Sequence, residues 1–148
     1  GEAGMAAARS VALLSYRGGP AYCLTQQDNE ELKGDLFKRR VHSYQRYQGE
    51  KLRRRFNAYS YASVSYAVDS HDIGRGRGGV VEALKNIKSR TFVVGITSDI
   101  LFTEVENRYL ADNIKGAHYH LIDSSFGHDG FLVEAESLNR LILEFINE

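Results

Sequence analysis

Two side chains that can transfer a proton follow the two strands that the sequence predicts. Asp99 comes after the apolar, β-branched run at residues 90–97, and His128 lies in the loop after a second predicted strand at residues 117–123. The carboxyl ends of parallel strands lie at one edge of a sheet, where ligands bind. A carboxylate there can accept the Nδ1 proton of an imidazole and orient it, and Nε2 can then take a proton from a nucleophilic hydroxyl. This order, an Asp and then a His, is that of the last two members of a Ser–Asp–His triad.

Each of these two residues also has an ordinary structural explanation. An Asp at the end of a strand often caps the helix that follows, and a loop containing Gly-His is often a solvated turn. Because Asp99 and His128 follow consecutive strands in the order that a triad requires, the pair favours the catalytic interpretation.

The pattern of residues 80–148 positions both side chains. The expected elements are a short helix at 80–87, a strand buried on both faces at 90–97, a helix at 103–114, a strand at 117–123 and one closing helix at 130–147. This order predicts two parallel strands joined by a right-handed crossover, and therefore an α/β fold. Two strands alone do not make a stable sheet, and the sequence offers no further convincing strand.

The first half of the chain is helical in pattern. One face carries Met5, Ala8, Val11, Ala12 and Ser15, and a second stripe carries Val41, Tyr44, Gln48, Leu52, Phe56 and Tyr59. Gly18-Gly19-Pro20 ends the first of these helices. Residues 58–68 fit a helix, although Ser63 to Tyr66 also alternates as a strand would. Residues 28–38 predict no element, and residues 74–79 form a glycine-rich loop.

Composition limits the classes of function. The 148 residues contain 19 Lys and Arg and 19 Asp and Glu, so the net charge of zero argues against nucleic-acid binding. The apolar stretches are far shorter than the ~20 residues of a membrane span, and no signal peptide is visible, so we expect no membrane partner and a cytoplasmic location. The single cysteine, Cys23, excludes an internal disulfide. The histidines lack ligand partners at suitable spacing, so we predict no metal.

Six motifs carry a resemblance to one enzyme family. They are Gly4-Met5-Ala6-Ala7-Ala8-Arg9, Ser15-Tyr16, Tyr47-Gln48-Gly49-Glu50-Lys51, Arg55-Phe56-Asn57-Ala58-Tyr59-Ser60-Tyr61, Ser98-Asp99-Ile100-Leu101-Phe102 and Gly127-His128-Asp129-Gly130-Phe131-Leu132. On these residues the sequence resembles homoserine O-acetyltransferase, of the α/β-hydrolase superfamily, over essentially its whole length. The resemblance implies the C-terminal portion of that fold. A helical lid at 1–73 and the loop at 74–79 would precede an α/β segment at 80–148, which holds the last two parallel strands.

The resemblance also implies a reaction and a site. The family moves the acetyl group of acetyl-CoA to the hydroxyl of L-homoserine, a step towards methionine, with acetyl-CoA as a substrate and no bound cofactor. It implies that Asp99 is the triad carboxylate and His128 the general base. It implies further that Asp129 holds the homoserine ammonium, that Arg9 and Tyr16 line the homoserine site, and that the lid helices form a homodimer.

The sequence departs from the family at three points. Thr103 stands where the family usually has Pro, and Asn57 where it usually has Asp. The nucleophile motif Gly-x-Ser-x-Gly is absent from the 148 residues. We therefore expect the C-terminal piece of an enzyme that is inactive alone and associates with the N-terminal part. The alternatives are a piece of another α/β-hydrolase-fold enzyme, such as a serine esterase, or a helical module that binds a partner through basic residues such as Arg53, Arg54 and Arg55.

Overall fold

The computed structural model describes residues 1–28 and 36–148, and these form two compact units. One unit contains Gly1–Ser15 and Gly19–His71, and the other contains Tyr16–Gly18 and Asp72–Glu148. Of the polar segment for which the sequence predicts no element, residues 29–35 lie outside the described residues. The second unit therefore includes three residues from a distant part of the sequence.

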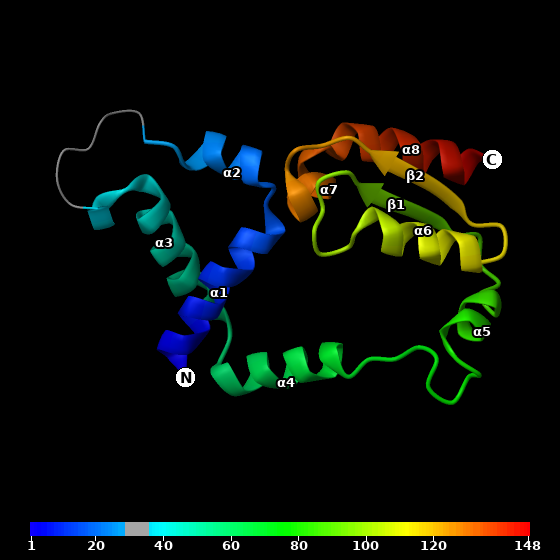
Figure 1. The fold of residues 1–148 in the computed structure, drawn as a ribbon, viewed down its shortest axis with the longest axis horizontal. Coiled ribbons are helices and arrows are strands. Elements are labelled where there is room, and N and C mark those ends of the chain that lie inside the picture. Colours follow the sequence, from blue (N-terminus) through cyan, green and yellow to red (C-terminus); the bar gives the residue numbers. More distant parts are fainter. Residues whose placement is uncertain (29–35) are drawn as a thin grey trace. The chain divides into compact units, whose positions relative to one another are not determined.

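The first unit is helical, as the sequence predicts (Figure 1). Its elements are α1 (Glu2–Tyr16, whose last residue belongs to the second unit), α2 (Gly19–Gln26), the 3₁₀ turn η1 (Leu36–Lys38), α3 (Arg40–Arg55) and α4 (Ala58–Asp69). The first helix ends just before Gly18, as expected, but α2 begins directly after this residue. Pro20 lies in the first turn of α2, where a missing backbone N–H costs nothing. The strand alternative for residues 58–68 is wrong, since the segment is α4.

The contact between α1 and α3 is close. A Cβ on the buried Gly49 of α3 would lie 3.1 Å from the Cβ of Ala6 in α1. This approach turns Leu13 inward, at 2% exposed, and leaves Val11 70% exposed. The predicted α1 face is therefore wrong at Ala8 and Val11, which are exposed because they are turned by about 160° and 140° from Ala6 around the helix.

The second predicted stripe does not form one helix. The α3 helix ends at Arg55, and Phe56 takes an extended conformation with φ −126° and ψ 147°. Asn57 then starts α4, because its side chain accepts a hydrogen bond of 2.8 Å from the amide of Ser60. Tyr59 is consequently on a separate helix and is 87% exposed.

The second unit is a small parallel α/β layer. The two strands, β1 (Phe92–Ile96) and β2 (His118–Ile122), pair in parallel, with Phe92 opposite His118 and Ile96 opposite Ile122. The helices are α5 (Val80–Lys85), α6 (Glu104–Asn113), α7 (Gly130–Val133) and α8 (Ala135–Asn147), and η2 (Gly127–Asp129) is a 3₁₀ turn. The α/β arrangement, the parallel pairing and the α6 crossover are as expected from the sequence.

Helices lie against both faces of this sheet. Phe145 of α8 stacks on Phe92 with ring centroids 5.2 Å apart, whereas Asn107 of α6 lies beside Gly95. Phe92 and Gly95 are an odd number of residues apart in β1, so they face opposite sides of the sheet. The buried apolar residues of this unit are Leu84, Ile96, Ile114 and Ile122.

Two expectations for this unit need correction. The closing helix is not continuous, because Glu134 (φ −85°, ψ 34°) separates α7 from α8. Strand β1 is also buried only at its carboxyl end, at Gly95 and Ile96, while the preceding three residues are half-buried. No helix among the described residues has the length and apolar character that a membrane crossing requires.

Candidate active site

Asp99 is held rigidly just beyond the end of β1. Its amide donates to the carbonyl of Ile96 at 3.1 Å, which turns the chain away from the strand. Its Oδ1 accepts hydrogen bonds from the amides of Leu101 and Phe102, at 2.8 and 3.1 Å, and its side chain is 5% exposed. The helix α6 has its own cap at Thr103. The interpretation of Asp99 as the cap of the next helix is therefore wrong.

His128 lies in η2 and contacts the second oxygen of Asp99. Its Nδ1 is 2.8 Å from Asp99 Oδ2, and its side chain is 24% exposed. A carboxylate only accepts hydrogen bonds, so the ring donates through Nδ1–H and Nε2 is the basic nitrogen of the neutral ring. This is the arrangement that general-base chemistry needs.

Aromatic rings surround the imidazole, so His128 is not in a freely solvated turn. The rings of Phe102 and Phe131 lie edge-on at 5.1 and 5.6 Å between centroids. The ring of Tyr16 lies at 6.0 Å and is tilted. These contacts restrict the imidazole to orientations that keep its bond to Asp99.

The segment Tyr16–Gly18 packs against the loop that carries His128. Gly127 has φ +65°, and a Cβ there would collide with the amide nitrogen of Gly18 and lie 2.7 Å from the carbonyl carbon of Arg17. Arg17 also forms an ion pair with Asp129, with Nε 3.2 Å from Oδ2. Only a glycine permits this close passage of two backbones.

Four of the five predicted site residues lie in the second unit. Asp99, Tyr16, Asp129 and His128 are linked there by the contacts described above. Arg9 lies on α1 in the first unit, so its part in the site stays a prediction. The predicted role of Asp129 towards an ammonium also stays a prediction, and in this structure its carboxylate contacts Arg17.

Sequence reasoning did not find two groups of residues around the pair. Arg17 gave no signal, because the ion pair joins residues 112 positions apart. Thr97 and Ser98 connect the ends of both strands through side-chain hydroxyls. The only available signal was their place directly before Asp99, since small hydroxyl side chains commonly bond to nearby backbone groups.

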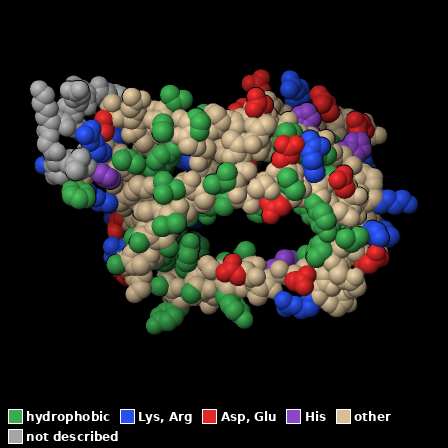
Figure 2. Space-filling model, in the orientation of Figure 1, with side chains coloured by type: hydrophobic (Ala, Val, Ile, Leu, Met, Phe, Trp, Pro, Cys, Tyr) green, Lys and Arg blue, Asp and Glu red, His purple; other side chains and the backbone are tan. Residues whose placement is uncertain are grey.

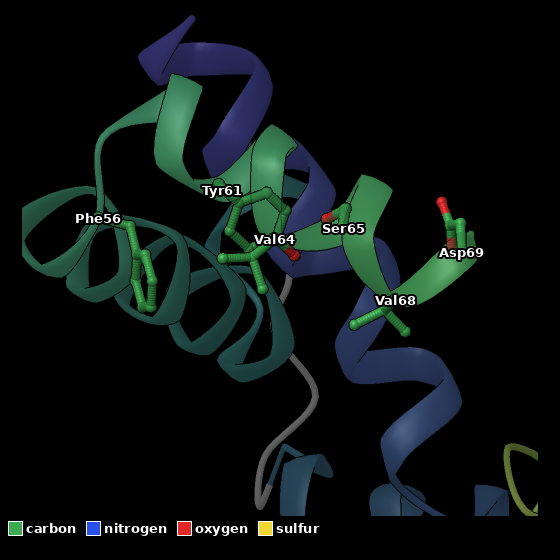
Figure 3. A pocket seen from close by; sticks show the side chains of 6 residues that line it. All are labelled: Phe56, Tyr61, Val64, Ser65, Val68 and Asp69. Atoms are coloured by element: carbon green, nitrogen blue, oxygen red, sulfur yellow. The ribbon is translucent and has the colours of Figure 1, made fainter. Parts of the chain in front are cut away.

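A separate concave surface lies in the first unit. Hydrophobic side chains are exposed along α4, among them Tyr59, Tyr66 and Val68 (Figure 2). A cavity of about 270 Å³ opens there, lined by Phe56, Tyr61, Val64, Ser65, Val68 and Asp69 (Figure 3). Its lining contains one carboxylate, Asp69, and no histidine, so it offers no pair comparable to Asp99 and His128.

The described part of the chain shows no metal site, and its single cysteine is exposed. No group of three His, Cys, Asp or Glu side chains among residues 1–28 and 36–148 could hold a metal ion. Cys23 is exposed on α2.

The fold and the Asp–His pair define the C-terminal portion of an α/β-hydrolase fold. The chain superposes on esterase E22 with a TM-score of 0.80, over 96% of this chain and 41% of that one, at 14% identity, which establishes the fold alone. It also superposes on homoserine O-acetyltransferase from Staphylococcus aureus, with a TM-score of 0.77 and 28% identity over 100% of this chain and 42% of that one.

The curated relatives that the chain matches in sequence are homoserine O-acetyltransferases. The chain is 45% identical over 148 residues to homoserine O-acetyltransferase of Cyclobacterium marinum, which covers 100% of this chain and 41% of the relative. The resemblance predicted from the motifs is thus confirmed. No family model matches the chain. The chain spans about two fifths of the length of the curated relatives that it matches.

Proposed function

We propose that this chain supplies the Asp and the His of a Ser–Asp–His triad in an acyltransferase that moves an acetyl group from acetyl-CoA to the hydroxyl of L-homoserine. The observation that carries the proposal is the 2.8 Å contact between Asp99 and His128 beyond the ends of two parallel strands. The 45% identity to the Cyclobacterium marinum enzyme supports this acyl transfer over the other reactions of the fold.

In the first half of the proposed reaction, His128 activates a serine. Nε2 takes the hydroxyl proton as the serine oxygen attacks the thioester carbonyl. The C–S bond then breaks, the CoA sulfur takes the proton from His128, and the acetyl group stays on the serine. Asp99 holds the ring by its Nδ1–H throughout and stabilises the imidazolium that forms.

In the second half, the acceptor replaces CoA. The homoserine hydroxyl loses its proton to Nε2 and attacks the acetyl carbonyl, and the serine oxygen leaves with that proton. The products are the acetyl ester of homoserine and the free serine. Asp129 would pair with the acceptor ammonium, and Arg9 and Tyr16 would line its site. We propose that the serine comes from residues outside these 148, which contain no Gly-x-Ser-x-Gly.

A chimeric enzyme tests this proposal. The chain replaces the matched 41% of the Cyclobacterium marinum protein, and the purified chimera is given acetyl-CoA with and without L-homoserine. We expect acetylated homoserine to form, and we expect its formation to require His128. Mass spectrometry of the product is the measurement, with the same chimera carrying His71→Ala as the matched control, because His71 lies in the other unit.

The acceptor separates this function from the alternatives. Acetyl-CoA cleavage that is equally fast without homoserine would instead make the protein a hydrolase, as in the esterase with which it shares its fold. A chimera that folds but has neither activity would contradict the proposal. A third outcome would support a module that binds through basic residues. The chain would then bind a random DNA duplex and would lose this binding in the triple variant Arg53→Ala, Arg54→Ala, Arg55→Ala.

A further inference from the structure

Ser98 lies between β1 and Asp99 and bonds to the loop that carries His128. Its Oγ accepts a hydrogen bond of 2.8 Å from the amide of Gly127 and donates one of 2.5 Å to the carbonyl of Ser124. We propose that Ser98 is a positioning residue that sets the distance between Asp99 and His128. This inference rests on the proposed function of that pair.

The position of this hydrogen bond in the chain supports that role. Ser98 directly precedes Asp99, and Gly127 directly precedes His128, so the hydrogen bond joins the two residues just before the reacting pair. Two links then connect the same two loops: Ser98 to Gly127 through a hydroxyl, and Asp99 to His128 through a carboxylate. The first link fixes the backbones from which the second pair of side chains extends.

The amide of Gly127 depends on this hydroxyl. Gly127 is buried and begins η2, so no earlier turn of that helix supplies a carbonyl for its N–H. Its backbone also lies against Gly18 with no room for a Cβ, which prevents the loop from shifting towards that side. Loss of the Ser98 hydroxyl leaves a buried donor without an acceptor, and the loop must move to find one.

Thr97 provides a matched control. Its Oγ1 accepts a hydrogen bond of 3.1 Å from the amide of Ser124, and it lies in donor range of Asp123 Oδ1, at 3.0 Å, and of the Ser124 carbonyl, at 3.2 Å. It therefore connects the same two loops, one residue earlier, without touching Gly127. Thr97→Val removes a hydroxyl that, like that of Ser98, bonds to the loop after β2. It leaves the hydrogen bond between Ser98 and the Gly127 amide in place.

The experiment compares Ser98→Ala, Ser98→Thr and Thr97→Val. In the chimera, we expect Ser98→Ala to lower kcat about 10²-fold, the usual cost of a small misplacement of a catalytic group, with little change in KM for acetyl-CoA. Ser98→Thr, which keeps the hydroxyl, should restore most of kcat, and Thr97→Val should change it far less. Unchanged kcat in Ser98→Ala, no rescue by Thr, or an equal loss in Thr97→Val would overturn the inference.

A second readout uses the 148-residue chain without chimera formation. We expect Ser98→Ala to speed hydrogen exchange at the Gly127 amide and to shift the proton resonance of His128 Nδ1–H, whereas Thr97→Val leaves both in place. An inactive wild-type chimera would refute the proposed function, and these spectra would still decide the role of Ser98. If Ser98→Ala does not fold, Ser98→Cys replaces it, because sulfur is a weaker acceptor than a hydroxyl oxygen and still fills the site.

Discussion

At the scale of single residues, the Asp99–His128 pair makes the sharpest prediction. In the chimera, His128→Ala removes the proposed base, and Asp99→Asn leaves the ring without a carboxylate at Nδ1. We expect each change to lower kcat at least about 10³-fold, and the double variant to lose little more, because the two residues act as one unit. Steady-state kinetics measure this, and additive losses would contradict a shared role.

The ion pair between Arg17 and Asp129 concerns the acceptor. If Asp129 binds the homoserine ammonium, Asp129→Asn removes a charge-assisted hydrogen bond and should raise KM for L-homoserine about 10–10²-fold. KM for acetyl-CoA should change little. Asp112→Asn, on α6, removes the same charge from another element and serves as the control. Equal effects on both KM values would place Asp129 in a structural role with Arg17.

At the scale of elements, both residues that depart from the family's usual pattern start helices. Asn57 caps α4 through its side chain, and Thr103 caps α6 with Glu106 in a reciprocal capping box. Asn57 therefore keeps the capping function that an Asp would have, whereas Thr103 supplies a side-chain acceptor that a Pro lacks.

The cap at Asn57 can be measured by unfolding. Asn57→Ala leaves the amide of Ser60 without its acceptor, and we expect a loss of about 1 kcal/mol in the free energy of unfolding. Asn57→Asp keeps the acceptor and should change stability much less. Urea unfolding of the two variants checks this, and equal losses would show that the side-chain bond contributes nothing.

The cap of α6 predicts a pH dependence. The amide and then the hydroxyl of Thr103 donate to Glu106, and these bonds lower the pKa of Glu106. A lowered pKa in the folded state stabilises the fold above the ordinary pKa of a Glu, about 4.3, and that stabilisation is lost as the pH falls through the lowered value. The free energy of unfolding of the natural chain should therefore exceed that of Glu106→Gln by less and less as the pH falls from about 6 to about 3.

Urea unfolding at several pH values tests this, with Thr103→Ala as the second variant. In the Thr103→Ala background the hydroxyl is absent, so Glu106→Gln should alter the acid dependence less. An identical pH dependence in both backgrounds would show that the Thr103 hydroxyl does not act on Glu106.

The elements themselves were largely predictable, and the exceptions have physical causes. Both strands and the α6 crossover follow from β-branched runs and helical spacing, and Asp99 and His128 follow from their places after the strands. The inward face of α1 could not be predicted from the sequence, because it depends on how closely Ala6 approaches Gly49. The break between α7 and α8 was not predictable either, because the residue there is Glu134 and not a Gly or Pro.

At the scale of the whole molecule, the proposed reaction needs more than these 148 residues. We expect the purified chain alone to transfer no acetyl group, and co-expression with the unmatched segment of the Cyclobacterium marinum enzyme to restore transfer. The acetylated product is measured by mass spectrometry, because the exposed Cys23 would react with the thiol reagents used to detect CoA. Turnover by the chain alone, abolished by His128→Ala, would contradict a nucleophile outside it.

The membership of Tyr16–Gly18 in the second unit also belongs to this scale. No local pattern in the sequence connects this segment to His128, because the connection is a backbone contact between two glycines and one ion pair. A boundary drawn from composition at the glycine-rich loop would separate Tyr16 and Arg17 from the residues that they contact.

That long-range contact has a consequence for how the protein is made. Arg17 and Asp129 are 112 residues apart, and a ribosome adds about 5–20 residues per second, so the first partner is synthesised roughly 6–20 s before the second. During that interval Tyr16–Gly18 has no loop to pack against. The Asp99–His128 pair therefore reaches the setting described above only after Tyr16–Gly18, both strands and Asp129 have all been synthesised.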